Sequence, residues 1–414
     1  MSASVYRLTS AATILFLALA LGTAPALAKT AVVATTAPDY SSGAHAVVSV
    51  SPENGSRTAT VNLVPTVSDI TVSAFGSSFF RIERFMADNV ARFEIEDPST
   101  PVWQYSTLDP DETVTSNPYG LVFVDETRAL LLRYGKAAAW FVDPSAPDGA
   151  GFKTGEIDLS ALADGDGIPE MAGGVLVDDR IYIILQRQDR NAGFVPGIGY
   201  VAVVDAATGS LVDPGIANPE GIPGIPLPAR NPQTIRYLPE NHTIYIACNG
   251  PFPGFGPPEL EYTGGIVTLD PDTYATHLLV DDGDADFHPY GTISTLAVLS
   301  PEKGYFVGFA GFGDNNLYAF HPETGAVTGP VAPSLQGRNL ATLAAGPDGL
   351  LWVGDATDAR IALVDPSTDT VTETVDTGLN PGRIVFVDDA DSESPPEDTG
   401  GGGGSGCFLR TLRD

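Results

Sequence analysis

The stretch IALVDPSTDTVTETVDTGLNPGRIVFVD, residues 361–388, decides the fold. It begins with an apolar strand that ends in Asp, continues through a Pro-Ser-Thr turn into a second strand, and reaches a third apolar strand after Asn-Pro. In such turns the Asp side chain accepts backbone N–H groups and Pro presets φ. The stretch therefore predicts a tight β-hairpin followed by the first strand of a further unit.

The same hairpin recurs along the chain. Seven copies are separated by 44 to 65 residues, and their turn positions are Ser51, Asp97, Asp143, Asp205, Asp270, His321 and Asp365. Four-stranded blades of β-propellers repeat at about 40 to 50 residues. The pattern predicts an all-β, seven-bladed β-propeller with two insertions, and we number the blades one to seven after these hairpins.

Two unmatched strands predict how the ring closes. The apolar segment 32–36 lacks an inner strand before it, whereas segment 384–387 is an inner strand with no blade after it. Pairing the two would form a composite blade and remove an open sheet edge, which is a site of aggregation. Residues 29–388 then form the propeller, with about 51 residues per blade.

Residues 359–388 resemble the YVTN-type repeat of surface-layer and periplasmic propellers. The pattern is a strand, an Asp turn, a strand, Gly-x-x-Pro and another strand, and residues 231–250 and 344–355 resemble that family's inner hairpin. The resemblance implies an exported propeller. It implies little about activity, because many functions use this scaffold.

The two ends of the chain differ from the propeller in composition. Residues 1–28 read as a signal peptide, with Arg7, an apolar run over 11–21 and the small-residue pattern Ala-Leu-Ala before Lys29. We therefore expect a periplasmic, cell-surface or extracellular protein. The run is shorter than the roughly 20 residues that span a bilayer, so no transmembrane segment is expected.

Residues 389–406 are acidic and then Gly-rich, which predicts a disordered linker. The tail 407–414 resembles bacterial sorting tails in which a Cys is processed, so surface attachment through Cys407 is one expectation. An ordinary disordered end is the alternative.

Net charge and missing motifs narrow the classes of function that the sequence supports. The formal charge is −31, which repels nucleic acid and anionic lipid. With two Cys, the fold must rely on its core instead of disulfides. The sequence has no HExxH, CxxC or phosphate-binding Gly-Lys-Ser/Thr motif, which weakens an enzymatic interpretation without excluding it.

Loops that enter the innermost strands converge on the mouth of a propeller's channel. A ring of amide, carboxylate and imidazole groups there could bind a polar ligand or a cation. The alternative is that each Asn before Pro only forms a turn. The predicted ligand-binding residues are Asn117, Glu170, Asn231, His288, Asn339 and Asn380.

Long loops between the second and third strands of blades four to six share that face. They are rich in Gly, Pro and aromatic residues, which suits binding of an envelope protein or a polysaccharide. The alternative is that these loops fold back as hydrophobic lids. The predicted partner-binding residues are Phe194, Phe252, Phe255, Tyr262 and Phe312.

The loop ADGDGIPE, residues 163–170, resembles one calcium-binding Asp-Gly repeat. Asp164, Asp166 and Glu170 are its candidate ligands for Ca²⁺ or another divalent cation, and a plain acidic loop is the alternative. No other cofactor is expected.

We thus expect an exported, non-enzymatic propeller that acts as a binding or surface-scaffold protein. The alternative is an enzyme, either a metal-dependent lactonase-like hydrolase, with Glu170 and Asn231 near the ion, or a cofactor-dependent dehydrogenase. Metal-dependent lactonases of this type have six blades, so seven blades count against the hydrolase.

Overall fold

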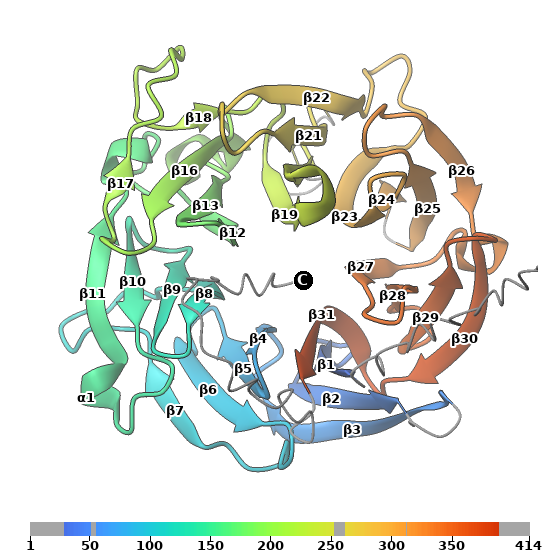
Figure 1. Cartoon of the computed structure of the whole chain (residues 1–414), viewed down its shortest axis with the longest axis horizontal. Helices are drawn as coiled ribbons and strands as arrows, with labels where there is room; N and C mark the ends of the chain where they lie inside the picture. Colours follow the sequence, from blue (N-terminus) through green and yellow to red (C-terminus); the bar gives the residue numbers. More distant parts are fainter. Residues whose placement is uncertain (1–28, 51–54, 252–260, 312, 389–414) are drawn as a thin grey trace, which may run out of the picture.

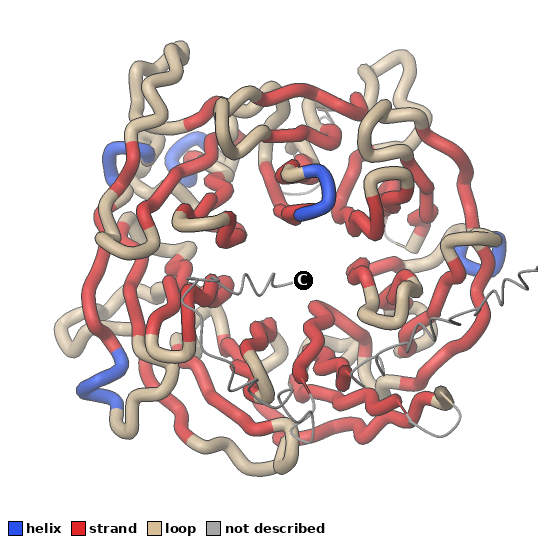
Figure 2. The backbone as a smooth tube through the Cα atoms, viewed as in Figure 1, coloured by secondary structure: helices blue, strands red, loops and turns tan. Residues whose placement is uncertain are grey.

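Seven β-sheets are arranged around a common central axis (Figure 1). The computed structural model describes residues 29–50, 55–251, 261–311 and 313–388. Each sheet is one blade, and neighbouring strands within it are antiparallel. The backbone of these residues is mostly strand, with a few short helical turns (Figure 2). The prediction of an all-β, seven-bladed propeller is confirmed.

Blades one to three use consecutive strands except at the closure. From the channel outward, blade one is β31 (Asn380–Asp388), β1 (Lys29–Thr36), β2 (Gly43–Val50) and β3 (Arg57–Thr66). Blade two is β4 (Ile70–Phe75), β5 (Ser78–Glu83), β6 (Asn89–Glu94) and β7 (Trp103–Ser106). Blade three is β8 (Pro118–Asp125), β9 (Arg128–Arg133), β10 (Ala138–Val142) and β11 (Lys153–Asp158), with helix α1 (Gly149–Phe152) before β11.

Blade four carries the largest departure from the four-stranded plan. It contains β12 (Met171–Val177), β13 (Arg180–Leu185), β16 (Tyr200–Asp205) and β17 (Leu211–Val212), and β18 (Ile225–Pro226) also pairs with β16. A separate small hairpin, β14 (Gln188–Asp189) and β15 (Val195–Pro196), lies in the connection between β13 and β16.

Blades five to seven are regular. Blade five is β19 (Pro232–Leu238), β20 (Thr243–Cys248), β21 (Gly265–Leu269) and β22 (Thr276–Asp281). Blade six is β23 (Thr292–Ser300), β24 (Lys303–Gly311), β25 (Asp314–Phe320) and β26 (Val327–Val331). Blade seven is β27 (Leu340–Ala345), β28 (Leu351–Asp355), β29 (Arg360–Asp365) and β30 (Thr370–Asp376). Short 3₁₀ turns occupy Ser160–Leu162, Arg190–Ala192, Pro239–Asn241 and Pro333–Leu335.

The ring closes as predicted. Strand β31 pairs antiparallel with β1, with Val33 opposite Ile384 and Val32 opposite Val385. Blade one is therefore built from both ends of the propeller, and the inner edge of β1 is covered.

The repeated hairpins join the third and fourth strands of each blade. In blade seven the Asp365 carboxylate accepts hydrogen bonds from the Ser367 backbone N (2.8 Å) and hydroxyl (2.7 Å). In blade six, where His replaces Asp, the ring Nδ1 of His321 accepts from the Glu323 N at 3.3 Å. Six of the seven predicted turn residues lie in these hairpins, and Ser51 falls outside the described residues.

The core is divided among the interfaces between blades. Seven clusters of buried apolar side chains lie one at each interface. On β13, Ile181 and Ile183 pack toward blade three, while Tyr182 and Ile184 pack toward blade five. Both faces of an inner strand are therefore buried, which explains its continuous apolar run.

Antiparallel order places the connections on two opposite faces. We call the loop face the one that holds the second-to-third strand loops and the loops leading from one blade to the next. The hairpin face holds the repeated hairpins. In the described part of the chain, no helix has the length and apolarity that a membrane crossing requires. The predicted signal peptide, the linker 389–406 and the tail with Cys407 lie outside the described residues.

Candidate functional site

Two loops of blade four bring carboxylates together on the loop face. The first loop leads from blade three into β12 and carries Asp164, Asp166 and Glu170. The second is the β14–β15 hairpin, which folds back over the first and supplies Asp189. A Cβ added at Gly165 would lie 2.8 Å from a carboxylate oxygen of Asp189, so the two loops touch at this glycine.

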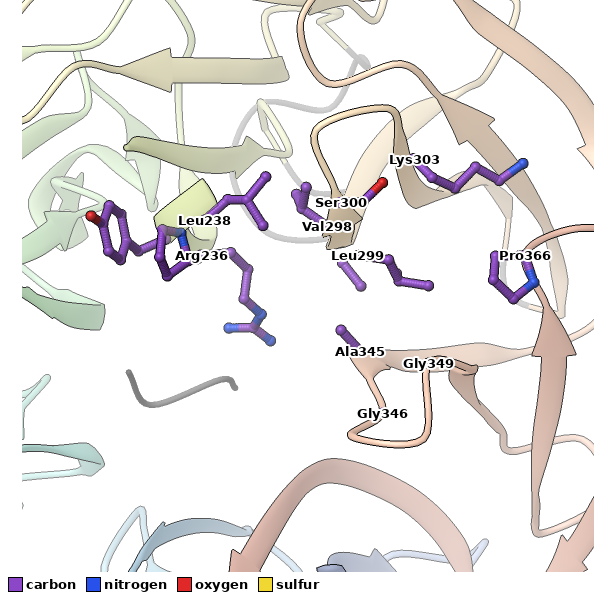
Figure 3. A pocket seen from close by; sticks show the side chains of 13 residues that line it. Arg236, Leu238, Val298, Leu299, Ser300, Lys303, Ala345, Gly346, Gly349 and Pro366 are labelled. Carbon is purple, nitrogen blue, oxygen red and sulfur yellow. The ribbon is translucent and has the colours of Figure 1, made fainter. Parts of the chain in front are cut away.

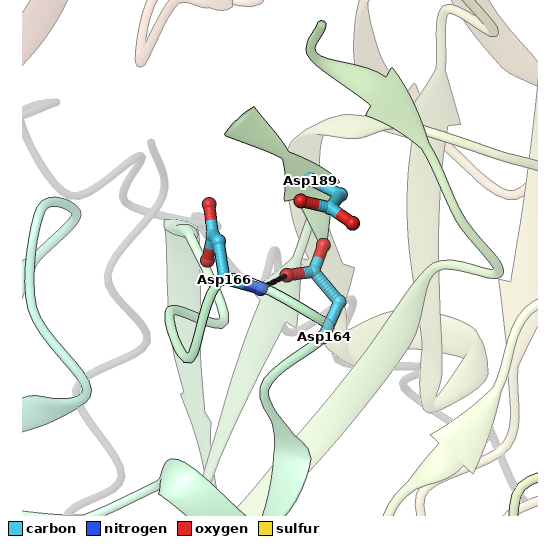
Figure 4. A group of neighbouring side chains, drawn as sticks. All are labelled: Asp164, Asp166 and Asp189. Atoms are coloured by element: carbon cyan, nitrogen blue, oxygen red, sulfur yellow. Dashed lines mark hydrogen bonds between the residues drawn. The ribbon is translucent and has the colours of Figure 1, made fainter. Parts of the chain in front are cut away.

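Three of these carboxylates converge (Figure 4). Asp164, Asp166 and Asp189 each offer an oxygen, and these oxygens lie within 4.8 Å of one another. Asp164 accepts a hydrogen bond from the Asp166 N at 3.2 Å, and Asp189 accepts one from the Asn191 N at 2.8 Å. The second oxygen of Asp164 is buried without a hydrogen-bond donor. The loops thus fix the acids in place and leave oxygens available.

Glu170 extends the cluster into the protein. It is 1% exposed, and its Oε2 accepts a hydrogen bond from the Gln188 N at 3.1 Å. Its Oε1 lies 3.5 Å from the guanidinium of Arg190, which also lies 3.7 Å from Asp166. Arg190 is therefore the arginine that lies beside this group of four carboxylates, in contact with Asp166 and Glu170.

The surroundings resist full ionisation of this group. Burial, and then the charges of Asp166 and Asp164, raise the pKa of Glu170 to about 8. Burial and the neighbouring Asp166 and Asp189 raise the pKa of Asp164 to about 6. A proton or a bound cation would relieve the repulsion. Of the predicted ligands, Asp164 and Asp166 converge with Asp189, whereas Glu170 lies beside the group, and cation binding stays a prediction. Asp189 and Arg190 were not identified from the sequence.

Glu170 connects to one further predicted residue, Asn231. Gln188 joins them, since its backbone binds Glu170 and its side-chain amide donates to the Asn231 Oδ1 at 2.8 Å. Asn231 also accepts from Gln233 (3.1 Å) and donates to the Gly250 carbonyl (2.8 Å). Its φ is +56°, and it is fully buried. Asn231 therefore holds the turn into β19, and its Oδ1 and one of its two amide N–H groups are already engaged within the protein.

The other predicted channel-mouth residues occupy separate blades. Asn117 precedes β8 with φ of +46°, and its Oδ1 is buried without a hydrogen-bond donor. The exposed His288 ring stacks on Tyr262 at 4.1 Å. Asn339 is exposed before β27, and Asn380 begins β31. Within the described chain, hydrogen bonds through Gln188 connect Glu170 with Asn231, and no such link joins the other four residues.

The predicted aromatic loops are described only in part. Phe194, at the tip of the β14–β15 hairpin, is 43% exposed. Tyr262 is half-buried against His288. Phe252, Phe255 and Phe312 lie outside the described residues.

Exposed apolar side chains are distributed unequally between the two faces. Among the described residues, eight large apolar side chains are well exposed, and seven of them lie in connections of the loop face. Val102, in a repeated hairpin, is the exception. The seven are Tyr40, Val67, Phe85, Met86, Val114, Phe194 and Phe287.

A cavity of about 210 Å³ opens on the opposite, hairpin face. The inner strands and turns of blades five to seven line it with mainly apolar groups, including Leu238, Val298 and Leu299 (Figure 3). Lys303 on its rim is paired with Asp369 at 2.8 Å. This cavity was not predicted, because it forms between turns that are far apart in the sequence.

Comparison with known proteins supports the fold alone. No protein-family model and no curated protein matches the chain. A protein from Lactobacillus plantarum is 15% identical, with a TM-score of 0.58, over 87% of this chain and 100% of its own. A Bacteroides fragilis protein assigned provisionally to the 6-phosphogluconolactonases is 14% identical, with a TM-score of 0.55, over 87% and 98%. Hydrazine synthase of Kuenenia stuttgartiensis is 12% identical, with a TM-score of 0.54, over 78% and 95%. At such identities the likeness places the chain among β-propellers and assigns it no activity.

Proposed function

We propose that this protein is an exported binding protein that holds a macromolecular partner on its loop face. The observation that carries this proposal is the placement of seven of the eight exposed large apolar side chains on that face. Single exposed apolar residues need no explanation, but their concentration on one side of a protein marks an interaction surface.

The contrast between the two faces supports the same role. The hairpin face repeats one tight turn, in which an Asp binds its own backbone, as Asp143 does with Ser145 at 2.8 Å. The loop face varies from blade to blade and includes the β14–β15 hairpin, whose tip exposes Phe194. Variable loops on a rigid scaffold are where binding sites usually lie.

Photo-crosslinking in the cells that produce the protein tests this proposal. A benzophenone amino acid replaces Phe194 or Tyr40 on the loop face, and Val102 on the hairpin face serves as the matched control. We expect specific adducts from the first two positions and none from Val102. Equal adduct yields from both faces, or none at all, would contradict a binding role for the loop face. N-terminal sequencing of the same material tests export, which predicts a mature protein starting at Lys29.

A metal-dependent hydrolase is the second candidate, because a buried acid adjoins a carboxylate cluster. A general acid or base is most effective when its pKa lies near the working pH, and the pKa of Glu170 is raised to about 8. Three oxygen ligands from Asp164, Asp166 and Asp189 suit a hard divalent cation beside it. Elemental analysis combined with a panel of lactones tests this candidate. Hydrolysis that needs metal and is lost in Glu170→Gln would favour it over the binding role.

A further inference from the structure

We infer that five exposed side chains over blades one and two form a docking surface for a basic, apolar polypeptide segment. The surface, which we call the blade-one/two patch, consists of Tyr40, Val67, Phe85, Met86 and Val114. The inference rests on the proposed function and deepens it. It assigns the basic, apolar segment of the partner to blades one and two, whereas the sequence indicated the loops of blades four to six.

The loops that carry the patch are joined side by side. The hydroxyl of Thr36 donates to the Ser68 carbonyl at 2.9 Å, which links the loop of Tyr40 to that of Val67. The Phe85 N donates to Asp69 at 3.2 Å, and the Met86 N donates to the Thr115 hydroxyl at 3.1 Å. Four consecutive loops of the ring thus form one continuous surface.

The patch is preformed. One carboxylate oxygen of the buried Asp88 accepts hydrogen bonds from the Thr115 hydroxyl (2.8 Å) and from the backbone N of Ser116 (2.8 Å) and Asn117 (2.9 Å). These bonds fix the loop of Phe85 and Met86 against the loop of Val114. A surface that is already ordered costs less conformational entropy when it binds.

Met86 supports a functional role for this loop. Its φ is +64°, a left-handed conformation that is unfavourable for a non-glycine residue, and its side chain is 77% exposed. The left-handed residue lets the chain turn back, with the Asp88 N donating to the Arg84 carbonyl at 3.0 Å, and this turn places the Met86 side chain in water. Such strain is typical of binding and functional sites.

The charge around the patch defines the partner. Asp39, Asp69 and Asp111 on the same loops are exposed. Ser41 lowers the pKa of Asp39 through hydroxyl and backbone hydrogen bonds, which keeps this carboxylate ionised. The one arginine of these loops, Arg84, is engaged by Asp69 at 3.3 Å and lies 3.7 Å above the Tyr119 ring. An acidic rim around an apolar centre complements lysine or arginine beside apolar side chains.

The other occupants fit less well. A second copy of the chain would bring another net charge of −31 against the same acidic rim. An anionic membrane meets the same repulsion. A glycan would need ring-stacking surfaces with polar groups between them. Tyr40 and Phe85 could stack on sugar rings, but the other three side chains of the patch are apolar and offer no hydrogen bonds to sugar hydroxyls. A basic polypeptide satisfies both the apolar centre and the rim.

Fluorescence anisotropy with defined peptides tests the inference. The probe is a fluorescein-labelled 14-residue peptide of alternating leucine and lysine, and the comparison peptides alternate glycine with lysine and leucine with glutamate. The test variant is Phe85→Ser/Met86→Asn, where Asn tolerates the left-handed backbone. Val102→Ser on the hairpin face and Phe194→Ser on blade four are the controls.

We expect the leucine–lysine peptide to bind the test variant at least tenfold more weakly than the wild type. Both controls should retain wild-type affinity, and all proteins should have matching melting temperatures. The two comparison peptides should bind the wild type at least tenfold more weakly than the leucine–lysine peptide.

Unchanged binding by the test variant would overturn the inference. If Phe194→Ser alone weakened binding, the loop face would keep its role and only the assignment to the blade-one/two patch would be wrong. If the wild type forms dimers that the double substitution abolishes, the patch binds a second copy of the chain. If the wild type sediments with phosphatidylcholine vesicles and the double variant does not, the patch binds lipid. Either result would overturn a basic polypeptide partner.

Discussion

Glu170 should make the protein less stable as the pH rises, and Glu170→Gln should remove that dependence. The pKa of this buried carboxyl is raised from an ordinary value of 4.5 to about 8. Between these two values the native state holds a proton that the unfolded state has released. The free energy of unfolding therefore falls with increasing pH across this window, and the loss is complete above the native pKa.

The magnitude follows from the size of the shift. One pKa unit corresponds to about 1.36 kcal/mol, so about 4 kcal/mol should be lost between pH 5 and pH 8 in the absence of divalent cations. Glutamine keeps the size and the hydrogen-bond acceptor of the side chain but does not ionise. Relative to the wild type, Glu170→Gln should therefore gain about 4 kcal/mol of stability over this interval. Asp164 titrates near pH 6, where Glu170 of the wild type is still mostly neutral, so its contribution largely cancels in the comparison.

Urea unfolding at pH 5, 6, 7 and 8 in the presence of EDTA measures the effect. Glu126→Gln is the matched control, because it makes the same chemical substitution at an exposed turn residue. Its pH dependence should follow the wild type. If the free energy of unfolding of Glu170→Gln shows the same pH dependence as that of the wild type, the Glu170 carboxyl does not hold a proton in the native state and the reasoning fails.

Three further predictions concern the cation site, the closure and the buried thiol. Ca²⁺ at 100 times its dissociation constant should stabilise the wild type by about 2.7 kcal/mol, as seen in thermal unfolding, and Asp164→Asn/Asp189→Asn should lose this response. An unchanged response would place the cation elsewhere. Val385→Asp puts an unpaired charge into the buried closing strand and should cost about 3–5 kcal/mol of unfolding free energy, whereas the exposed Thr374→Asp on β30 should cost under 1. Burial raises the pKa of the Cys248 thiol, so in a Cys407→Ser background Ellman's reagent should react only after denaturation; rapid native reaction would contradict its burial.

The sequence predicts the propeller well because its signals are local. Each repeated hairpin carries its own turn chemistry, as Asp365 and Ser367 illustrate, and such turns keep their form in any blade. The closure was also predictable, since segments 32–36 and 384–387 each lacked a partner strand. Both inferences needed only the repeat pattern of the strands and the number of strands in each blade.

The candidate site was only partly predictable because it depends on how loops fold over one another. Asp189 and Arg190 reach Asp164 and Asp166 only because the β14–β15 hairpin folds over them, and the repeat pattern of the sequence does not predict this hairpin. The amide of Asn231 could serve as a ligand, yet its side chain accepts hydrogen bonds from Gln188 and Gln233 and donates one to the Gly250 carbonyl.

The sequence did not predict the blade-one/two patch, for a different reason. Phe85 and Met86 directly follow the apolar strand β5, so in the sequence they look like part of the core. Only the left-handed turn at Met86 carries them out to the surface.

The closure of blade one has a consequence for the order in which the molecule is made. Blades two to seven each draw on one consecutive stretch and can form as the chain lengthens, but β1 waits for a partner 351 residues away, because Val33 pairs with Ile384. Contacts of such long range form late in folding. A polypeptide interrupted before residue 380 keeps an unpaired strand edge, which proteases and other unpaired strands can reach. Closure therefore distinguishes complete chains from shortened ones, since only a chain that has been synthesised through β31 can cover the edge of β1.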